Sequence, residues 1–514
     1  MIISIAKRAL RHSLFLVPCS LFSFLLSHAQ KPSFITDSLD AYIQKGLKDW
    51  QLPGLAIVIV KDGKIVVMKG FGIKDIGTNE PVDENTLFFI ASNSKLFTGT
   101  ALAQLDYQKK ISLNDKITKY FPDYRLYDTL STRLVTIRDM LCHRIGTKTF
   151  QGDFTFWNTK LTSKEIMMRM RYLKPSTPFR QDYGYCNSCF LTAGEVIPKV
   201  TGRSWVQYVT DSILVPLQMN GSFASSNDMV KRTNKATPYT TSYTNKLAQV
   251  PYDKWDNLGP AAGIISNVND LSHWLLFQLD SGRYNGRQLM PWAILQKTRD
   301  VNIINSSRKS ALFPTHFRGY GLGLSSADYN GRQIYWHTGG AAGMVSNVCF
   351  VPEERLGIAI LTNNDNQNFF EALRYQVLDA FLGMPYVNRS GQLLDGFNKG
   401  MDVQVKEIAD WRAKVKDNKP ALPLQAYAGT YTNQLYGNMT VSVKENKLYI
   451  SFLTHPDLTA TLSYMENGEW LTEYSNIEYG IYKTKFTLQN NKVLSAEIKV
   501  NDFVEYDPYT FVKK

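Results

Sequence analysis

The residues best suited to chemistry are Ser92 and Lys95, three positions apart at the start of an apolar segment. Phe97, Ala101 and Leu105 recur every four positions in that segment, which predicts a largely buried helix. Side chains three positions apart lie one turn apart on the same face of a helix. A serine hydroxyl is a weak nucleophile until a neighbouring base or cation activates it. The spacing therefore indicates a nucleophilic serine with a lysine beside it.

The same Ser-x-x-Lys spacing occurs a second time, at Ser306 and Lys309. That copy lies in a polar run without helical periodicity, which predicts a loop. Because so short a motif recurs by chance, the assignment of Ser92 depends on motifs elsewhere in the chain.

A Tyr-x-Asn motif would supply a phenol and an amide to such a site. Tyr185 and Asn187 match it, and the same pattern begins at Tyr243, Tyr431 and Tyr474. Tyr185 follows a glycine turn and precedes a helix-like apolar stretch, whereas the second copy falls in a polar loop and the last two in strand-like sequence near the C-terminus. The context favours Tyr185 and Asn187 as the residues that belong with Ser92.

A third motif, His337-Thr338-Gly339-Gly340, ends a predicted strand. No other His-Thr-Gly and no Lys-Thr-Gly occurs in the chain. We expect this strand end to lie beside the serine.

The order Ser-x-x-Lys, Tyr-x-Asn, His-Thr-Gly resembles that of the class C β-lactamase and DD-peptidase superfamily of serine hydrolases. The resemblance extends over roughly residues 34–385 and includes three supporting stretches, Leu141–His143, Gly259–Gly263 and Tyr320–Gly323. It implies that Ser92 forms an acyl-enzyme with Lys95, Tyr185 and His337 as catalytic partners. It also implies substrate binding by Asn187, Thr338, Gly339 and Gly340, with an oxyanion hole formed by the backbone N–H groups of Ser92 and Gly340.

The general base has two candidates. A free tyrosine has a pKa near 10, and a unit charge about 4 Å away at an effective dielectric near 20 changes it by roughly three units. Lys95 could therefore make the phenolate of Tyr185 accessible near neutral pH. Alternatively, a desolvated and neutral Lys95 is itself the base. The sequence leaves both open.

The chain departs from the family pattern at two places. Ile145-Gly146 stands where relatives have Ser-Gly, and His337 replaces the lysine of most β-lactamases. Because histidine is mostly neutral at pH 7, it offers no fixed charge to a substrate carboxylate. We expect weak or absent β-lactamase activity. We expect cleavage of a small peptide amide or ester instead, by a D-amino-acid-type peptidase or carboxypeptidase or by an esterase. The alternatives are penicillin-binding or β-lactamase activity, and a non-catalytic ligand-binding protein on the same fold.

The strand and helix signals predict an α+β fold of the β-lactamase/transpeptidase type, an antiparallel sheet flanked by helices with a helical subdomain. Residues 30–385 form this predicted hydrolase domain, and residues 386–421 a helical linker with a helix at 402–416. Residues 422–514 show short period-two runs, which are typical of a small all-β barrel. This tail resembles the lipocalin-like barrel appended to some peptidases of the superfamily.

The first residues, 1–29, have the basic start and short apolar core of an export signal, which predicts a periplasmic or secreted protein. The core is too short to span a bilayer, so we expect no stable membrane insertion after cleavage. The net charge of +13 is scattered without a basic stripe, which argues against nucleic acid.

The expected partner is a small molecule or short peptide, and the barrel could carry an oligomer contact. No cofactor is expected, and the histidines show no metal-binding spacing. Cys186 and Cys189 are expected as small buried residues, with a local disulfide as the alternative.

Overall fold

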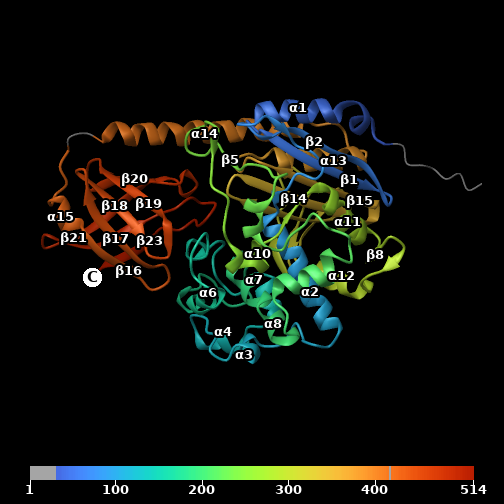
Figure 1. Ribbon diagram of the computed structural model, residues 1–514, viewed down its shortest axis with the longest axis horizontal. Helices are drawn as coiled ribbons and strands as arrows, with labels where there is room; N and C mark the ends of the chain where they lie inside the picture. The colour runs from blue at the N-terminus through green and yellow to red at the C-terminus, as the bar shows by residue number, and fades with distance from the viewer. Residues whose placement is uncertain (1–30, 416–417) are drawn as a thin grey trace, which may run out of the picture.

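The computed structural model describes residues 31–415 and 418–514, so the predicted export signal lies outside the described residues. The chain forms a large α+β domain and a C-terminal barrel, and one long helix runs from one to the other (Figure 1).

A nine-stranded antiparallel sheet is the centre of the large domain, with the strand order β10-β11-β12-β13-β14-β15-β1-β2-β3. The neighbouring strands β15 and β1 lie inside the sheet, and both are apolar and buried along almost their whole length. Asp62 and Gly63 both have positive φ between β1 and β2, as a tight Asp-Gly hairpin turn requires. The strands span β1 (Gly54–Lys61), β2 (Lys64–Asp75), β3 (Glu80–Pro81), β10 (Ile303–Ser306), β11 (Arg318–Tyr320), β12 (Ser325–Tyr329), β13 (Arg332–Ala341), β14 (Met344–Val351) and β15 (Leu356–Thr362).

Successive side chains of β1 enter two different cores. Ile57 and Ile59 join the core under α1 (Leu39–Asp49) and α13 (Phe369–Phe381). Val58 and Val60 join the larger core that contains α2 (Ser94–Tyr107) and α11 (Val268–Leu279). Because strand side chains alternate between faces, the sheet is covered by helices on both sides.

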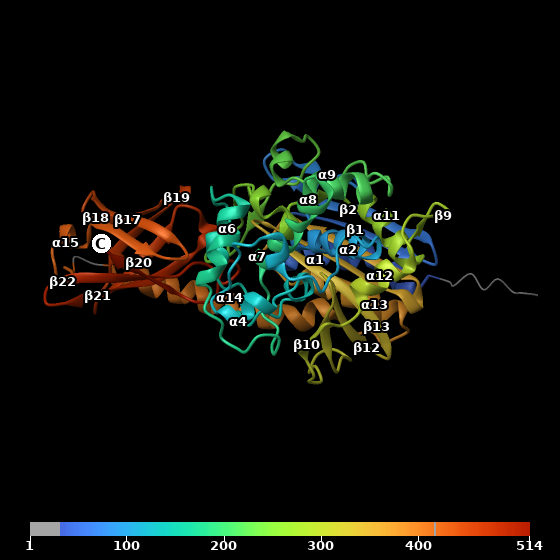
Figure 2. The same cartoon turned by 90° about the horizontal axis from the view of Figure 1, so that it is seen from below.

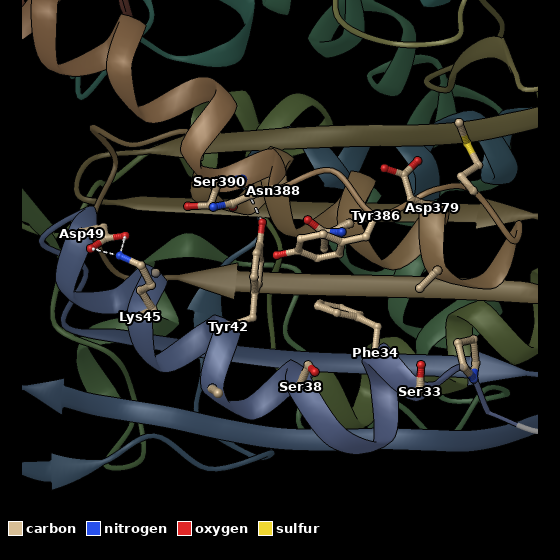
Figure 3. A pocket seen from close by; sticks show the side chains of 16 residues that line it. Ser33, Phe34, Ser38, Tyr42, Lys45, Asp49, Asp379, Tyr386, Asn388 and Ser390 are labelled. Atoms are coloured by element: carbon tan, nitrogen blue, oxygen red, sulfur yellow. Dashed lines mark hydrogen bonds and ion pairs between the residues drawn. The ribbon is translucent and has the colours of Figure 1, made fainter.

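The face covered by α1 lies away from the predicted catalytic residues. Tyr42 accepts a hydrogen bond from the backbone N–H of Ser390 at 2.9 Å, and Lys45 pairs with Asp49. Figure 3 shows these side chains around a groove of about 550 Å³ that α1, α13 and the chain after α13 enclose. None of the predicted site residues lines this groove.

The remainder of the large domain is a helical region on the α2 side of the sheet. It comprises α3 (Ile117–Tyr120), α4 (Thr129–Leu134), α5 (Ile137–Leu141), α6 (Ser163–Arg169), α7 (Asn187–Gly194), α8 (Val196–Thr201), α9 (Trp205–Val209), α10 (Gly259–Ala262) and α12 (Trp292–Arg299). Short strand pairs join it, namely β4 (Phe88–Phe89) with β7 (Ile265–Ser266), β5 (Tyr239–Thr240) with β6 (Ala248–Gln249), and β8 (Arg283–Tyr284) with β9 (Arg287–Gln288).

The linking helix α14 spans Arg389–Lys414 and begins well before the predicted residue 402. The sequence missed its first half because Gly391, Gly396 and Gly400 are poor helix formers. Two tertiary features hold that half in place. The side chain of Asn388 caps the helix by accepting from Gly391 N, and Phe397 packs on Trp50 of the large domain with ring centroids 5.0 Å apart.

The C-terminal body is a closed antiparallel barrel of eight strands, which confirms the predicted all-β barrel. Strand β20 departs from the period-two pattern, because Trp470, Leu471 and Thr472 are buried one after another and do not alternate. The strands are β16 (Gly429–Asn433), β17 (Gly437–Lys444), β18 (Lys447–Phe452), β19 (His455–Tyr464), β20 (Glu469–Tyr474), β21 (Ile481–Gln489), β22 (Lys492–Ile498) and β23 (Tyr509–Lys513), preceded by the short helix α15 (Leu424–Tyr427).

Figure 2 shows α6 on the side of the large domain that faces the barrel. Among the described residues, no helix is both long and apolar enough to cross a membrane. Cys142, Cys186, Cys189 and Cys349 are buried free thiols, so the structure has no disulfide between Cys186 and Cys189.

Candidate active site

Ser92 lies in a single 3-10 turn, Ala91–Asn93, immediately before α2. The residue before it, Ala91, is held at φ +44°, a left-handed conformation that costs energy for any residue except glycine. The turn is surrounded by core residues, yet Ser92 itself is only half-buried and lines a pocket. The strained turn therefore presents one hydroxyl to solvent from an otherwise buried element.

Lys95 is fully buried one turn further along, and its Nζ has three oxygen neighbours. These are Ser92 Oγ at 3.0 Å, Asn187 Oδ1 at 2.7 Å and the backbone carbonyl of Ala261 at 2.9 Å. Burial lowers the pKa of Lys95 to about 7, although the nearby Asp153 opposes the shift. The amine therefore exists in both protonation states near neutral pH.

Asn187, the first residue of α7, connects Lys95 to a buried carboxyl group. Its Oδ1 accepts from Lys95, and its Nδ2 donates to Asp153 Oδ2 at 2.6 Å. Burial raises the pKa of Asp153 well above the usual range. Sequence reasoning missed Asp153, because a single aspartate in a loop-like region carries no distinguishing pattern.

Tyr185 lies on the pocket side of the same cluster. Its side chain lines the pocket together with Ser92, and Lys95 Nζ lies 4.8 Å from its ring centroid. Burial raises the pKa of this phenol well above 10, although the Ser92 side chain opposes the shift. The phenol is therefore protonated near neutral pH.

His337 lies on β13 and is held as a neutral imidazole by two hydrogen bonds. Its Nδ1 is 2.8 Å from the carbonyl of Thr338, which can only accept, so Nδ1 carries the proton. Its Nε2 then accepts from the Tyr320 hydroxyl at 2.9 Å. Burial, followed by the charge of Lys95, lowers the pKa of His337 to about 3.

The rest of the third motif places β13 against the serine turn. Thr338 Oγ1 accepts from Asn347 at 2.9 Å, while Thr338 and Gly340 line the same pocket as Ser92. A methyl group on Gly339 would lie 2.0 Å from the carbonyl oxygen of Ile90, so only glycine allows this approach of the two segments.

The other copies of the short motifs lie elsewhere. Ser306 ends β10 and is followed by exposed residues, so the loop predicted there is only in part a loop. Tyr243 pairs through its hydroxyl with Tyr482 of the barrel, and Tyr431 and Tyr474 belong to barrel strands. None of these residues lines the pocket at Ser92.

That pocket has a volume of about 440 Å³, and eight of the nineteen residues that line it are aromatic. No lysine or arginine is among the described residues that line it, and its one carboxyl group comes from Asp365. Its aromatic lining consists of Phe150, Trp157, Tyr183, Tyr185, Tyr320, Trp336, Phe370 and Phe503. The site combines a paired serine and lysine with an apolar, cation-free surface for a ligand.

The fold and the paired Ser92 and Lys95 are those of penicillin-recognising serine enzymes and their relatives. The Beta-lactamase family profile matches residues 39–381, and the chain belongs to this family. A second profile, described as "Domain of unknown function (DUF3471)", matches residues 413–513.

Among curated proteins, the chain is 26% identical over 371 residues to "Protein flp" of Staphylococcus aureus (strain MRSA252), covering 70% of each. It is also 26% identical over 438 residues to "Unguisins hydrolase ungD'" of Aspergillus campestris (strain IBT 28561), covering 79% of this chain and 77% of that protein.

A solved structure, the octameric penicillin-binding protein homologue from Pyrococcus abyssi, has a similar fold. It superposes with a TM-score of 0.59 at 21% identity and covers 92% of this chain and 99% of its own. This likeness concerns the fold, and with the family match it confirms the predicted α+β architecture.

Proposed function

We propose that this protein is a serine hydrolase that cleaves an uncharged ester or short peptide amide through an acyl-enzyme on Ser92. The observation that carries the proposal is the 3.0 Å contact between Ser92 Oγ and Lys95 Nζ, in a site where burial lowers the lysine pKa to about 7. A base whose pKa lies near the working pH is the most effective one.

The hydrogen bonds of Lys95 favour the amine over the phenol as the base. A neutral amine has two N–H groups, which the oxygens of Asn187 and Ala261 accept, and its lone pair is then left for the Ser92 hydroxyl proton. Tyr185, whose pKa burial raises, stays protonated and lines the pocket beside Ser92.

The reaction then runs in two halves. Ser92 Oγ bonds to the carbonyl carbon as Lys95 takes the hydroxyl proton, and the protonated Lys95 returns that proton to the departing alcohol or amine. Water attacks the acyl-enzyme in the second half, and Lys95 takes a proton from that water. The proton returns to Ser92 Oγ as the carboxylic acid leaves. Backbone N–H groups of Ser92 and Gly340 are the proposed donors to the oxyanion.

The choice of an uncharged substrate rests on His337 and the pocket lining. A neutral imidazole and a lining without lysine or arginine give a substrate carboxylate no charge partner. Burying an unpaired charge is costly, so we expect neutral esters and peptide amides, D-amino-acid peptides with a blocked carboxyl end among them, to be better substrates than β-lactams. Rapid turnover of a chromogenic cephalosporin would contradict this preference.

A fluorophosphonate probe tests the proposal directly, because it reacts with an activated serine. We expect covalent labelling of the full chain and its loss in Ser92→Ala, with the unfolding temperature of the variant unchanged. Absence of labelling, or labelling that persists without Ser92, would instead support the non-catalytic binding protein.

Two further parts of the proposal concern location and assembly. The export-like composition of residues 1–29 supports a periplasmic or secreted enzyme, and mass spectrometry of the secreted chain should find an N-terminus near residue 30. The octameric neighbour supports an oligomer, which light scattering on the purified protein would measure.

A further inference from the structure

The segment between β22 and β23 of the barrel extends into the pocket at Ser92. Phe503 in this segment lines the pocket together with Ser92 and Gly340, although about 160 residues separate it from the nearest of the three motifs. Every other aromatic residue of the lining comes from the large domain.

Phe503 lies directly on the strand that carries the third motif. A methyl group placed on Gly340 would lie 2.4 and 2.6 Å from two atoms of the Phe503 ring. The ring also makes an edge contact with Trp157, with centroids 5.8 Å apart. Phe503 therefore closes the space beside the position that a reacting carbonyl would occupy near Gly340.

The same segment is fixed to the large domain next to the polar cluster. Glu505 accepts from the backbone N–H groups of Gly152 at 2.8 Å and Phe154 at 3.3 Å. These two residues flank Asp153, which is bonded to Asn187. This barrel segment thus contacts the apolar side of the pocket. It also contacts the loop around Asp153, which positions Asn187, the hydrogen-bond partner of Lys95.

The large domain in turn inserts one side chain, that of Phe154, into the barrel. Phe154 is buried among aromatic side chains at one end of the barrel, and it stacks on His455 with centroids 4.5 Å apart and planes 3° apart. Its other aromatic neighbours in the barrel are Tyr436, Phe452, Tyr479 and Tyr509. This exchange of side chains holds the barrel in one orientation relative to the pocket.

The segment itself is braced, so Phe503 has a defined position. Asn501 donates to the carbonyl of Glu478 at 2.9 Å and accepts from Phe503 N at 3.0 Å. Lys148 of the large domain pairs with Asp507 at 2.8 Å. These contacts distinguish the segment from a free loop.

We propose that barrel residues 499–508 complete the active site, and that Phe503 determines which substrates enter by limiting the size of the apolar group beside the reacting carbonyl. The inference rests on the proposed function of Ser92. It assigns the barrel a part in substrate selection, because Phe503 forms one wall of the pocket. The preferred substrate is then an ester or amide that carries a small apolar group.

The first test measures kcat/KM on two ester series in the full-length protein. In one, acyl chains lengthen from acetate to octanoate on a p-nitrophenyl leaving group. In the other, the acyl group is fixed and the alcohol grows. Phe503→Ala should raise the ratio of long to short substrates in at least one series by tenfold or more. Phe486→Ala removes a barrel phenylalanine packed on Trp470, away from the pocket, and should leave both ratios unchanged.

The second test uses the contact with Gly340. Gly340→Ala should lower kcat/KM on the acetate by at least tenfold, because its methyl group collides with the ring. The double variant with Phe503→Ala should recover most of this loss, whereas additive losses would show that the two residues do not meet.

Fluorophosphonate labelling separates failure of this inference from failure of the proposed function. If the unmodified chain is labelled but neither ester series responds to Phe503→Ala, the barrel does not select the substrate and the inference is wrong. If the unmodified chain is not labelled, the hydrolase assignment itself fails.

Discussion

The two sides of the pocket are built differently. The reactive side consists of polar groups from one domain, with Ser92 and Lys95 on adjacent turns of the chain and Asn187 bonded to both Lys95 and Asp153. The opposite side is aromatic, and the barrel supplies Phe503 to it. The pairing of Ser92 with Lys95 thus follows from short-range spacing, while the shape of the opposite side depends on how two domains dock.

The strongest test of the reactive side removes the amine. Lys95→Met should lower kcat/KM by about 10²–10⁴-fold, the usual contribution of a general base. Lys164→Met on the exposed surface of α6 is the matched control and should have no effect. A Lys95→Met enzyme of near-normal activity would exclude the amine as the base.

The pH dependence distinguishes the two candidate bases. A lysine base is active when deprotonated, so kcat/KM for a neutral ester should rise through pH 7 and then level off. Two pH units below the pKa, the active fraction is about a hundredth of its maximum. A rate that continues to rise beyond pH 10 would instead identify Tyr185, whose pKa burial raises.

Substitutions of Asp153 test how much its hydrogen bond with Asn187 contributes to activity. Asp153→Ala leaves the buried Asn187 amide without its acceptor, at a cost of about 1–3 kcal/mol, and kcat should fall by roughly tenfold or more. Asp153→Asn retains an oxygen acceptor and should recover much of the loss. Equal losses in the two variants would show that the carboxyl group itself matters, beyond its hydrogen bond.

On the aromatic side of the pocket, two esters that differ only in a carboxylate group test whether the lining offers a substrate any positive charge. We expect a neutral ester to be preferred over its carboxylate-bearing analogue by about tenfold, which corresponds to about 1.4 kcal/mol. His337→Lys should narrow this ratio, because it adds a positive charge to the lining. A ratio that does not respond to the substitution would mean that residue 337 does not meet the substrate.

The smallest expected effect is on the pH dependence of the free energy of unfolding, through the buried carboxyl group of Asp253. Burial raises the pKa of Asp253 to about 7, so the folded state holds a proton that the unfolded chain has already released above pH 4. The contribution of this group to the free energy of unfolding should therefore fall as the pH rises from about 4 through 7.

The unfolding temperature of the unmodified protein should fall between pH 5 and pH 8. In Asp253→Asn this fall should be smaller by about 3 °C. Asp228→Asn, at a carboxyl group that pairs with Lys231 on the surface, is the control. Identical slopes in all three proteins would contradict a buried, proton-holding Asp253.

Much of the fold was predictable because its signals are local. The Asp62-Gly63 turn, the apolar run of β1 and the period-two strands of the barrel each express a short-range rule. The first half of α14 was not predictable, because its glycines disfavour a helix and packing on Trp50 compensates for them. The predicted catalytic and substrate-binding roles remain predictions. The structure places Ser92, Tyr185 and His337 in the lining of one pocket, with Lys95 buried behind Ser92.

Neighbouring residues alone specify the spacing of Ser92 and Lys95, the motifs at Tyr185 and His337 and the division into two parts. The protonation of Lys95 and His337 follows from the folded arrangement, because desolvation depends on the whole surrounding core. The folded arrangement alone also brought Asp153 to Asn187 and Phe503 to Gly340. Contacts between segments so far apart leave no periodicity or motif in the chain, since they arise only when separate elements pack together.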